Sequence, residues 1–381
     1  MSDIQFFIQR ETLLKPLQSV ANIVDRKPHN LSIVANILFS VQPNRLVLTA
    51  TDLEVEIQAS EALPDEAVKS AGEFTLPARK LLDICRSLPT DAMISFDVDH
   101  DKKRCTVRSE KSKFILSCLS VTDFPVFSHT ESIAMEIDRH HLRELFEQTV
   151  FAMAQQDVRY YLTGLLMEFE RHKVSAVATD GHRLSFAGIS VLNNAFDDKI
   201  QLIFPRKAVQ ELMRLLQDQS SDEDLLKLNI ADDQRTLLFT FDNIRFAAQL
   251  LDGQYPDYHK VIPKQGAYKI QADRLTLRDL LFRTAILSNE KYRGIRLHFE
   301  QGRLLASANN PEKDEAEEDM EVVYSNEAIA IGFNVTYLLD AINAIKDDDV
   351  QLEFQNADSS CIVRSTNPDT DSLHVVMPLK L

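Results

Sequence analysis

Apolar residues recur with helical spacing at three places that open successive segments of the chain. In each, leucines and other apolar residues fall three, four or seven positions apart, which is typical of an amphipathic helix packed on a core. The predicted apolar stripes comprise Leu13, Leu14, Leu17, Val20, Ala21 and Val24, then Leu142, Leu145, Phe146 and Met153, and then Leu277, Leu280 and Leu281. Asp138 and Asp273 precede the second and third helices and are predicted N-caps.

A second apolar helix follows in each segment, and its spacing is the same in all three copies. The three helices are predicted to begin near Pro77, Pro205 and Phe333, which are 128 residues apart. A second marker keeps this step, because Asp52 and Asp180 are 128 residues apart and Asn309 follows after 129. The apolar residues are Leu81, Ile84, Cys85 and Leu88, then Val209, Leu212, Met213 and Leu216, and then Val335, Leu338, Leu339 and Ile342. Because both markers recur at nearly the same spacing, the sequence indicates three related domains.

Alternating apolar and polar residues between the helices predict antiparallel strands. The expected strands are 37–41, 46–48 and 53–57, then 164–169, 174–178 and 184–187, and then 295–299 and 304–308. Two helices and about eight strands per repeat predict an α+β fold with helices on one face of the sheet. Loops near 128–133 and 263–268 place the three domains at residues 1–130, 131–264 and 265–381.

Composition narrows the class of protein. The 381 residues suffice for several cores, no apolar run approaches a membrane span, and the N-terminus lacks the apolar run of a secretory peptide. Four dispersed cysteines predict reduced thiols in a cytoplasmic protein. A formal charge of −16 argues against nucleic-acid binding by the whole surface, although a local basic face stays possible.

No motif predicts catalysis, a cofactor or a metal site. The chain has no phosphate-binding glycine loop, no zinc-protease helix, no serine-hydrolase elbow and no EF-hand loop. Asp180 and His182 flank Gly181, so a hydrolase using this dyad is one hypothesis. The alternative is a tight Asp-Gly turn, which the sequence favours because no nucleophile accompanies the dyad.

Cations at helix starts are the first sign of a ligand. Helix N-termini favour acids, yet Arg79, Lys80, Arg206 and Lys207 stand there. The opening helices add further cations, namely Lys15, Arg26, Lys27, Arg139, Arg143, Arg274, Arg278 and Arg283. If one helix alone carried these cations, a solvated helix face would explain them. Because the cations recur in all three repeats of an acidic protein, they indicate a basic inner face that contacts a phosphate backbone.

Two segments of opposite charge indicate self-association. The basic one, in the first repeat, comprises Lys102, Lys103, Arg104, Arg108, Lys111 and Lys113, and the acidic one, in the third, comprises Glu312, Asp314, Glu315, Glu317, Glu318, Asp319 and Glu321. At opposite ends of a three-unit array they predict head-to-tail pairing of two chains. Phe114, Leu116, Ile286 and Leu287 are expected to form the apolar centre of that joint, with Lys80 at its edge.

The apolar C-terminus, HVVMPLKL, is expected both to close a sheet and to contribute to a groove, with Pro378 suited to an edge strand.

Motifs spread over the whole chain resemble one family. They include ATDLEVE, PARKLLDICRSLP, QDVRYYLTG, VATDGHRL, DGQYPDY, AILSNEKYRGIRL, ANNPEKDEAEE and VVMPLKL. In order, these are similar to the bacterial sliding clamps, the beta subunits of DNA polymerase III. The resemblance implies a non-catalytic, head-to-tail homodimer whose six domains encircle double-stranded DNA without reading its sequence, so that a polymerase stays attached.

The resemblance also implies a peptide-binding groove between the second and third domains. It would receive short linear motifs of the clamp loader, the replicative polymerase alpha subunit, translesion polymerases and repair proteins. The residues carried over to it are Leu162, Thr179, Gly181, His182, Arg183, Leu184, Pro256, Lys260, Val261, Asn334, Tyr337, Ser360, Val376, Met377, Pro378 and Leu379. An apolar slot with a few polar groups suits such peptides.

DNA contacts carried over in the same way are Lys27, Gln156, Arg159, Tyr160, Tyr161 and Lys207. Lys27 and Lys260 stand where arginine is expected, and Asp358 where an apolar residue is common, which changes details of affinity. A three-domain scaffold that binds peptides but does not encircle DNA is the alternative to a clamp.

Overall fold

The computed structural model describes residues 4–24, 32–127, 135–191, 199–217, 224–231, 235–264 and 266–380. They fall into two compact units. The first combines Met1–Arg139 with Gln210–Leu250, and the second combines His140–Val209 with Leu251–Leu381. The second repeat contributes to both units, because its strands pair with strands of both neighbours. Both predicted domain boundaries touch residues outside the described ranges, so they stay a prediction.

The first unit contains two antiparallel sheets. The five-stranded sheet has the order β5 (Val68–Ser70), β1 (Ile4–Gln9), β7 (Met93–Asp99), β8 (Arg104–Ser109) and β9 (Ser112–Ser117). The eight-stranded sheet has the order β10 (Met135–Asp138), β15 (Leu225–Ile230), β16 (Thr236–Phe241), β17 (Ile244–Gln249), β4 (Val55–Ala62), β3 (Arg45–Thr51), β2 (Asn36–Gln42) and β6 (Gly72–Pro77). Pairing of β17 with β4 joins the second repeat to the first.

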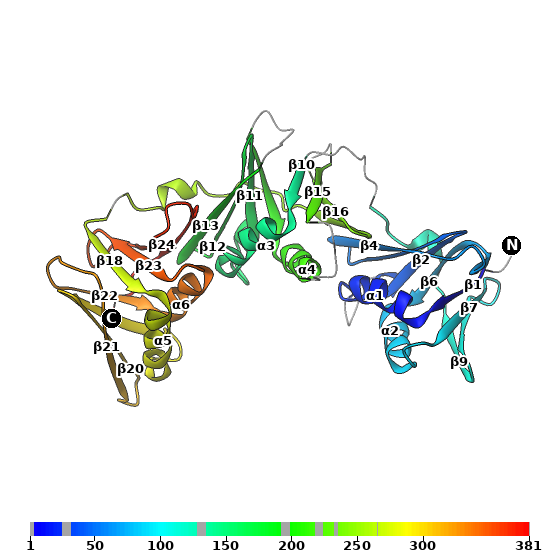
Figure 1. Cartoon of the computed structure of the whole chain (residues 1–381), viewed down its shortest axis with the longest axis horizontal. Coiled ribbons are helices and arrows are strands. Elements are labelled where there is room, and N and C mark those ends of the chain that lie inside the picture. Colours follow the sequence, from blue (N-terminus) through cyan, green and yellow to red (C-terminus); the bar gives the residue numbers. More distant parts are fainter. Residues whose placement is uncertain are drawn as a thin grey trace. The chain divides into compact units, whose positions relative to one another are not determined.

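Helices α1 (Arg10–Ala21) and α2 (Ala78–Ser87) pack together, and α1 covers β3 and β4 (Figure 1). The short 3-10 helices η1 (Ser32–Ala35) and η2 (Val121–Asp123) complete the first repeat. The core is rich in phenylalanine, because Phe6 stacks on Phe96 at 4.7 Å and Phe39 on Phe74 at 4.9 Å between ring centroids. All four rings are buried.

The second unit repeats this plan. Its eight-stranded sheet has the order β14 (Ile200–Pro205), β11 (Gly164–Glu170), β12 (Lys173–Thr179), β13 (Arg183–Ser190), β25 (Ser372–Val376), β24 (Cys361–Ser365), β23 (Asp349–Phe354) and β18 (Tyr268–Asp273). The four-stranded sheet has the order β21 (Glu315–Glu321), β20 (Arg303–Asn309), β19 (Gly294–Glu300) and β22 (Ile329–Asn334). Here the pairing of β13 with β25 joins the second repeat to the third.

Helices α5 (Arg274–Thr284) and α6 (Val335–Ala344) pack together over these sheets (Figure 1). Helices α3 (Arg139–Glu147) and α4 (Arg206–Leu216) belong to the second repeat. The remaining 3-10 helices are η3 (Val150–Ala152), η4 (Tyr160–Thr163), η5 (Tyr258–Lys260) and η6 (Ala285–Leu287).

Most predicted elements are confirmed, with four corrections. Helix α1 ends at Ala21, so Val24 lies beyond it. Helix α3 ends at Glu147, so Met153 lies beyond it, after η3. Leu53 lies in a turn rather than a strand, because its φ of 80° is incompatible with extended backbone. Strand β25 ends at Val376 in the middle of a sheet, and Pro378 makes a single bridge to Phe333 of β22 instead. The predicted N-cap Asp273 is confirmed, since its carboxylate accepts from the Thr276 N–H at 2.7 Å.

The turn between β3 and β4, and its counterpart between β12 and β13, show the internal repetition in their hydrogen bonds. Asp52 Oδ1 accepts from the amides of Glu54 and Val55, and Asp180 Oδ1 accepts from the amides two and three residues on. Residue 181 has a φ of 89°, which glycine adopts without strain, whereas the first repeat places Leu53 there. The third repeat departs, because Asn310 closes a longer loop onto Asp314.

Candidate partner-binding and DNA-binding sites

The predicted partner site lies where β13 begins and β25 ends. In the sheet register Arg183 is opposite Val376, and the Met377 N–H donates to the His182 carbonyl at 3.0 Å. The Leu379 N–H then donates to the Gly332 carbonyl at 2.7 Å. The C-terminal segment therefore runs from β13 of the second repeat to β22 of the third. Met377 and Leu379 are thus each held by a backbone hydrogen bond.

Apolar side chains form a floor below this surface. A buried cluster combines Leu184 with Leu166, Val177, Tyr258, Ile362 and Val375. The predicted contacts Leu162, Leu184 and Val376 are buried, so they shape the site from below. Met377 and Val261 are 45% and 47% exposed and are the apolar groups that a ligand could cover. Burial of both would add a modest hydrophobic contribution to binding.

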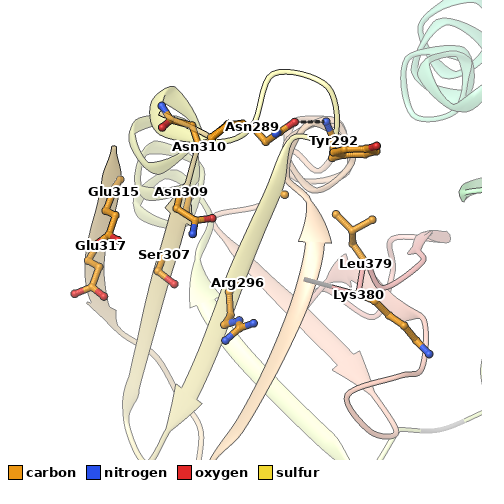
Figure 2. Close-up of a pocket in the computed structure, with 14 residues that line it drawn as sticks. Asn289, Tyr292, Arg296, Ser307, Asn309, Asn310, Glu315, Glu317, Leu379 and Lys380 are labelled. Atoms are coloured by element: carbon orange, nitrogen blue, oxygen red, sulfur yellow. Dashed lines mark hydrogen bonds between the residues drawn. The ribbon is translucent and has the colours of Figure 1, made fainter. Parts of the chain in front are cut away.

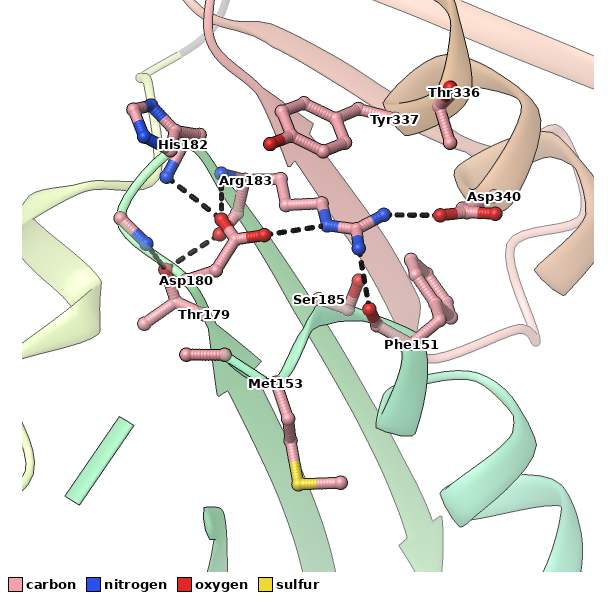
Figure 3. A network of polar contacts seen from close by, with 12 residues as sticks. Phe151, Met153, Thr179, Asp180, His182, Arg183, Ser185, Thr336, Tyr337 and Asp340 are labelled. Atoms are coloured by element: carbon pink, nitrogen blue, oxygen red, sulfur yellow. Dashed lines mark hydrogen bonds and ion pairs between the residues drawn. The ribbon is translucent and has the colours of Figure 1, made fainter. Parts of the chain in front are cut away.

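Arg183 is the centre of a polar network that ties the two repeats together (Figure 3). Its Nε donates to Asp180 at 3.0 Å, and Nη2 donates to the Phe151 carbonyl at 2.6 Å. Its Nη1 forms an ion pair with Asp340 of α6, and the guanidinium lies 4.5 Å from the centroid of the Tyr337 ring. The side chain is mostly buried, so Arg183 positions the site and offers few donors to a ligand.

Other predicted contacts stand around this network. His182 is exposed, and its ring stacks on Tyr337 at 6.4 Å between centroids. Burial raises the pKa of Tyr337 above its usual value. Asn334 is occupied as the N-cap of α6, since its side chain accepts from the Thr336 N–H at 2.9 Å. Thr179 is held by a contact within the second repeat, because its N–H donates to the Tyr255 hydroxyl at 3.1 Å.

The linker between the second and third repeats completes the rim. Pro256 and Lys260 are exposed, and Lys260 pairs with Asp257 at 3.2 Å. Tyr258 anchors this linker, because its hydroxyl donates to Glu168 at 2.7 Å. Ser360 immediately precedes Cys361, which lies opposite Val376 in the sheet register and so brings Ser360 near the terminal segment.

The predicted DNA contacts divide into three groups. Gln156 and Arg159 lie on the segment between η3 and η4, and Tyr160 and Tyr161 are the first two residues of η4; of these four, only Tyr161 is half-buried and the others are exposed. Arg159 is held by Asp157 through bonds of 3.0 and 2.8 Å, which lower the pKa of that carboxyl to about 2. Lys207 is half-buried at the start of α4. Lys27 lies outside the described residues.

Two arginines expected on the basic face, Arg139 and Arg274, have another role, and Arg10 shares it. Arg10, Arg139 and Arg274 are each the first residue of an opening helix, and each donates to carbonyls at the end of that repeat's second helix. The contacts are Arg10 with the Cys85 and Arg86 carbonyls, Arg139 with Leu215 and Leu216, and Arg274 with Asp347 just past α6. Cations satisfy the unpaired carbonyls and complement the dipole there.

Arg139 is only 6% exposed and also pairs with Asp242, so its assignment to a DNA-facing surface was wrong. Arg79 and Arg206 likewise donate to backbone carbonyls, of Val24 and Met153. Burial lowers the pKa of Arg206. The cations at helix starts are therefore largely structural, which removes much of the sequence argument for a phosphate-binding face.

Most of the charged residues predicted for the dimer joint lie on or beside two outermost strands. Strand β9, at one edge of its sheet, carries exposed Lys113, and exposed Lys111 lies in the turn just before it, while Lys80 is exposed on α2. Strand β21 carries exposed Glu315 and Glu317, with Glu312 before it, whereas Glu318 is bonded to Arg283. Ile286 is 68% exposed, but Leu116 is only 8% exposed, while its neighbour Ile115 is 54% exposed. Phe114 and Leu287 are half-buried.

The Asp180–His182 pair does not form an acid–base dyad. Asp180 accepts from the backbone N–H of His182 at 2.9 Å and from the Arg183 guanidinium, so its carboxylate is used by the turn. The part of the chain that the structure describes contains no group of three metal-ligating side chains. Within the same ranges, no helix has the length and apolar character needed to cross a membrane.

Comparison with known proteins identifies the family. Models of the N-terminal, central and C-terminal domains of the DNA polymerase III beta subunit match residues 4–128, 136–257 and 259–380. The chain belongs to the DNA polymerase III beta subunit family. The beta sliding clamp of Pseudomonas putida is 45% identical over 379 residues, covering 99% of this chain and all of that protein. The beta sliding clamp of Escherichia coli K12 is 39% identical over 381 residues, with the same coverage.

Solved structures of beta subunits share the fold. The DNA polymerase III subunit beta from Pseudomonas aeruginosa superposes with a TM-score of 0.92 at 43% identity, covering 99% of this chain and all of that one. A beta sliding clamp from Caulobacter crescentus gives 0.93 at 32% identity over both full chains. Membership of the beta subunit family confirms the predicted α+β clamp fold and the prediction of a non-catalytic DNA sliding clamp.

Proposed function

We propose that two copies of this chain close head to tail into a six-domain ring that encircles double-stranded DNA and tethers a polymerase to it. The observation that supports this most strongly is a pair of outermost strands of opposite charge. Strand β9 and the turn just before it present Lys113 and Lys111, and β21 presents Glu315 and Glu317. An outermost strand offers unpaired backbone groups to another chain, and a head-to-tail contact that closes gives a ring.

Exposed apolar residues supply the centre of this joint. Ile286 and Phe282 lie exposed on the third repeat, and Ile115 lies exposed on β9. Ile115 replaces the buried Leu116 in the proposed contact, while Phe114 and Leu287 stay at its margin. A desolvated apolar centre within a charged rim is the usual composition of a stable interface. The charges would set the orientation, and the apolar groups would supply most of the affinity.

DNA would occupy the ring through contacts that ignore base sequence. Lys207 and the segment from Gln156 to Tyr161 supply cations, amides and hydroxyls suited to phosphates. The net charge of −16 disfavours DNA elsewhere on the surface. Retention would therefore be topological and not a consequence of tight binding, and the protein would act on chromosomal DNA in the cytoplasm.

Partners would bind where the terminal segment meets β13. Met377 and Val261 offer apolar surface, His182 and Lys260 offer polar groups, and the buried floor keeps them in place. This chemistry suits short peptides with apolar anchors. The clamp loader, the replicative polymerase alpha subunit, translesion polymerases and repair proteins would share it in turn.

A charge-exchange experiment tests the ring. One variant carries Lys111→Glu with Lys113→Glu, and a second carries Glu315→Lys with Glu317→Lys. Each alone places like charges at both joints, so each should sediment as a monomer at low salt. Mixed in equal amounts, the two variants restore opposite charges at both joints and should form a mixed dimer.

A matched control exchanges Asp65→Lys and Glu66→Lys, which lie in the exposed loop between β4 and β5. This control should sediment as the unaltered chain does. Dimers of either interface variant alone, or monomers in the mixture, would contradict the proposed joint. A monomeric unaltered chain would favour the alternative of a peptide-binding scaffold.

A further inference from the structure

The sulfur-containing side chains of this chain are divided between the core and the surface. All four cysteines are buried. Burial raises the pKa of Cys85 and Cys361 to about 12 and that of Cys118 to about 11, and it also raises the pKa of Cys105. Because the thiolate is the reactive form of cysteine, these four thiols are poor targets for an oxidant at neutral pH.

The methionines differ from one another in exposure. Among those that the structure describes, Met93 and Met377 are exposed, at 47% and 45%. The others are half-buried or buried, namely Met135, Met153, Met167, Met213 and Met320. A thioether has no acidic proton, so its oxidation depends on access by the oxidant. A small oxidant in solution therefore meets Met93 and Met377 first.

Backbone hydrogen bonds keep Met377 at the surface. Its N–H donates to the His182 carbonyl at 3.0 Å, and the Leu379 N–H donates to the Gly332 carbonyl at 2.7 Å. Beyond Met377, Leu379 and Lys380 line one side of a pocket of about 720 Å³ on the four-stranded sheet (Figure 2). The segment is thus fixed along the surface, and the Met377 side chain stays accessible to a small oxidant.

We propose that Met377 is an oxidation site whose conversion to the sulfoxide reversibly weakens partner binding. The inference rests on the proposed partner site, in which Met377 is one of the apolar groups that a peptide would cover. The sulfur lone pair attacks one oxygen of hydrogen peroxide, an S–O bond forms and the O–O bond breaks. The departing hydroxide takes the proton of the transferred oxygen and leaves as water, so the sulfur is oxidised by two electrons and the peroxide is reduced by two.

The sulfoxide would act on the partner site and leave the rest of the protein in place. Its oxygen accepts hydrogen bonds, and an apolar anchor that covers it removes it from water without supplying a donor. The residues proposed for the ring joint and for DNA contact include no methionine or cysteine. An oxidised chain would therefore release its partners while it stays closed around DNA. Methionine sulfoxide reductases, which draw electrons from thiols, would restore partner binding.

Fluorescence polarisation with the full chain tests this. The probe is a fluorescein-labelled tetrapeptide with apolar anchors and no sulfur, Leu-Ser-Leu-Phe. The chain is treated with hydrogen peroxide, the peroxide is removed, and the oxidation of each methionine is measured by mass spectrometry of its peptides. We expect Met93 and Met377 to be oxidised before the buried methionines, and the affinity for the probe to fall about fivefold or more as Met377 is oxidised. Methionine sulfoxide reductases for both sulfoxide epimers, with dithiothreitol, should restore the affinity.

Two variants assign the effect to one side chain. Met93→Leu removes the other exposed methionine, which lies on β7 in the first unit, and this variant should lose affinity on oxidation as the unaltered chain does. Met377→Leu is compared with itself before and after treatment with peroxide, and its affinity for the probe should not change on treatment.

Three results would overturn the inference. They are a Met377 that stays reduced while Met93 is oxidised, an unchanged affinity when Met377 is fully oxidised, and a loss of affinity that persists in Met377→Leu. In each of these cases, binding of the probe by the untreated chain would leave the proposed partner site intact. Failure of the untreated chain to bind the probe would refute that site, and the inference with it.

Discussion

Arg139 provides the sharpest test of whether the arginines at helix starts serve the fold or the DNA. Its guanidinium donates to the last two carbonyls of α4 at 3.1 and 3.3 Å and forms a 3.1 Å ion pair with Asp242. It also lies 5.5 Å from the centroid of the Phe241 ring. Arg139→Met would leave a partly buried carboxylate and two helix-end carbonyls without their cation. Removing one partner of a buried pair costs about 3–5 kcal/mol.

For a unit of this size, each kcal/mol lowers the melting temperature by about 2–4 °C, so a decrease on the order of 10 °C is expected. Thermal unfolding followed by circular dichroism measures it. The melting temperature of Arg139→Lys should lie between those of the unaltered chain and Arg139→Met, because lysine retains the charge but loses the planar fork. The matched control is Arg303→Met, whose pair with Asp319 is exposed and screened by solvent, so the melting temperature of this variant should stay close to that of the unaltered chain.

The salt dependence of DNA binding separates the two roles. A phosphate contact by Arg139 would contribute about one to the slope of log affinity against log salt. We expect the slope to be unchanged in Arg139→Met when it is measured below the melting transition. A melting temperature within 2 °C of the unaltered chain, together with a shallower slope, would refute the structural role.

Three further changes have defined outcomes. His374 is fully buried against Ser185, and burial lowers its pKa to about 3 from 6.5. The folded state therefore binds fewer protons between these values, so stability is complete above pH 6.5 and falls by about 1.4 kcal/mol per pH unit below it. His374→Gln should flatten this dependence in urea titrations at pH 7 and pH 5, and an unchanged slope would contradict it. Ile286→Lys should place a charge in the joint and yield monomers by sedimentation, whereas a surviving dimer would exclude that contact. Met377→Asp should weaken binding of a fluorescein-labelled tetrapeptide with apolar anchors, Leu-Ser-Leu-Phe, about tenfold or more in fluorescence polarisation while the chain still forms dimers, and unchanged affinity would reject the partner site.

The repeat and its elements were accessible from sequence because they depend on local signals. Helix periodicity and the Asp-Gly turn each depend on a few neighbouring residues, and the step of 128 residues follows from comparing such local patterns along the chain. The register of β17 with β4, and of β13 with β25, was not accessible, since it pairs strands more than 180 residues apart. Strand periodicity indicates which face of a strand is buried but does not identify the neighbouring strand.

The roles of side chains were likewise predictable where they depend on neighbouring residues and not where they depend on residues distant in sequence. Alternation along β9 could have indicated that Ile115 points away from Leu116 and is the exposed apolar residue. For Arg10, Arg139 and Arg274, the available signal was an arginine at the first position of each opening helix. At Arg139 and Arg274 this cation was interpreted as a phosphate ligand, because the sequence does not show the end of the second helix packed beside it. The same limit applies to Arg183, whose partners Phe151 and Asp340 are distant in sequence.

The central claim is topological, so the most direct measurement is retention on DNA of different topology. The protein is loaded onto nicked circular DNA with a clamp loader and ATP, and half of the sample is then linearised. Gel filtration should show the protein retained on circles and lost rapidly from linear DNA, because a sliding ring leaves only over an end. Equal retention on both would show ordinary surface binding and contradict encirclement.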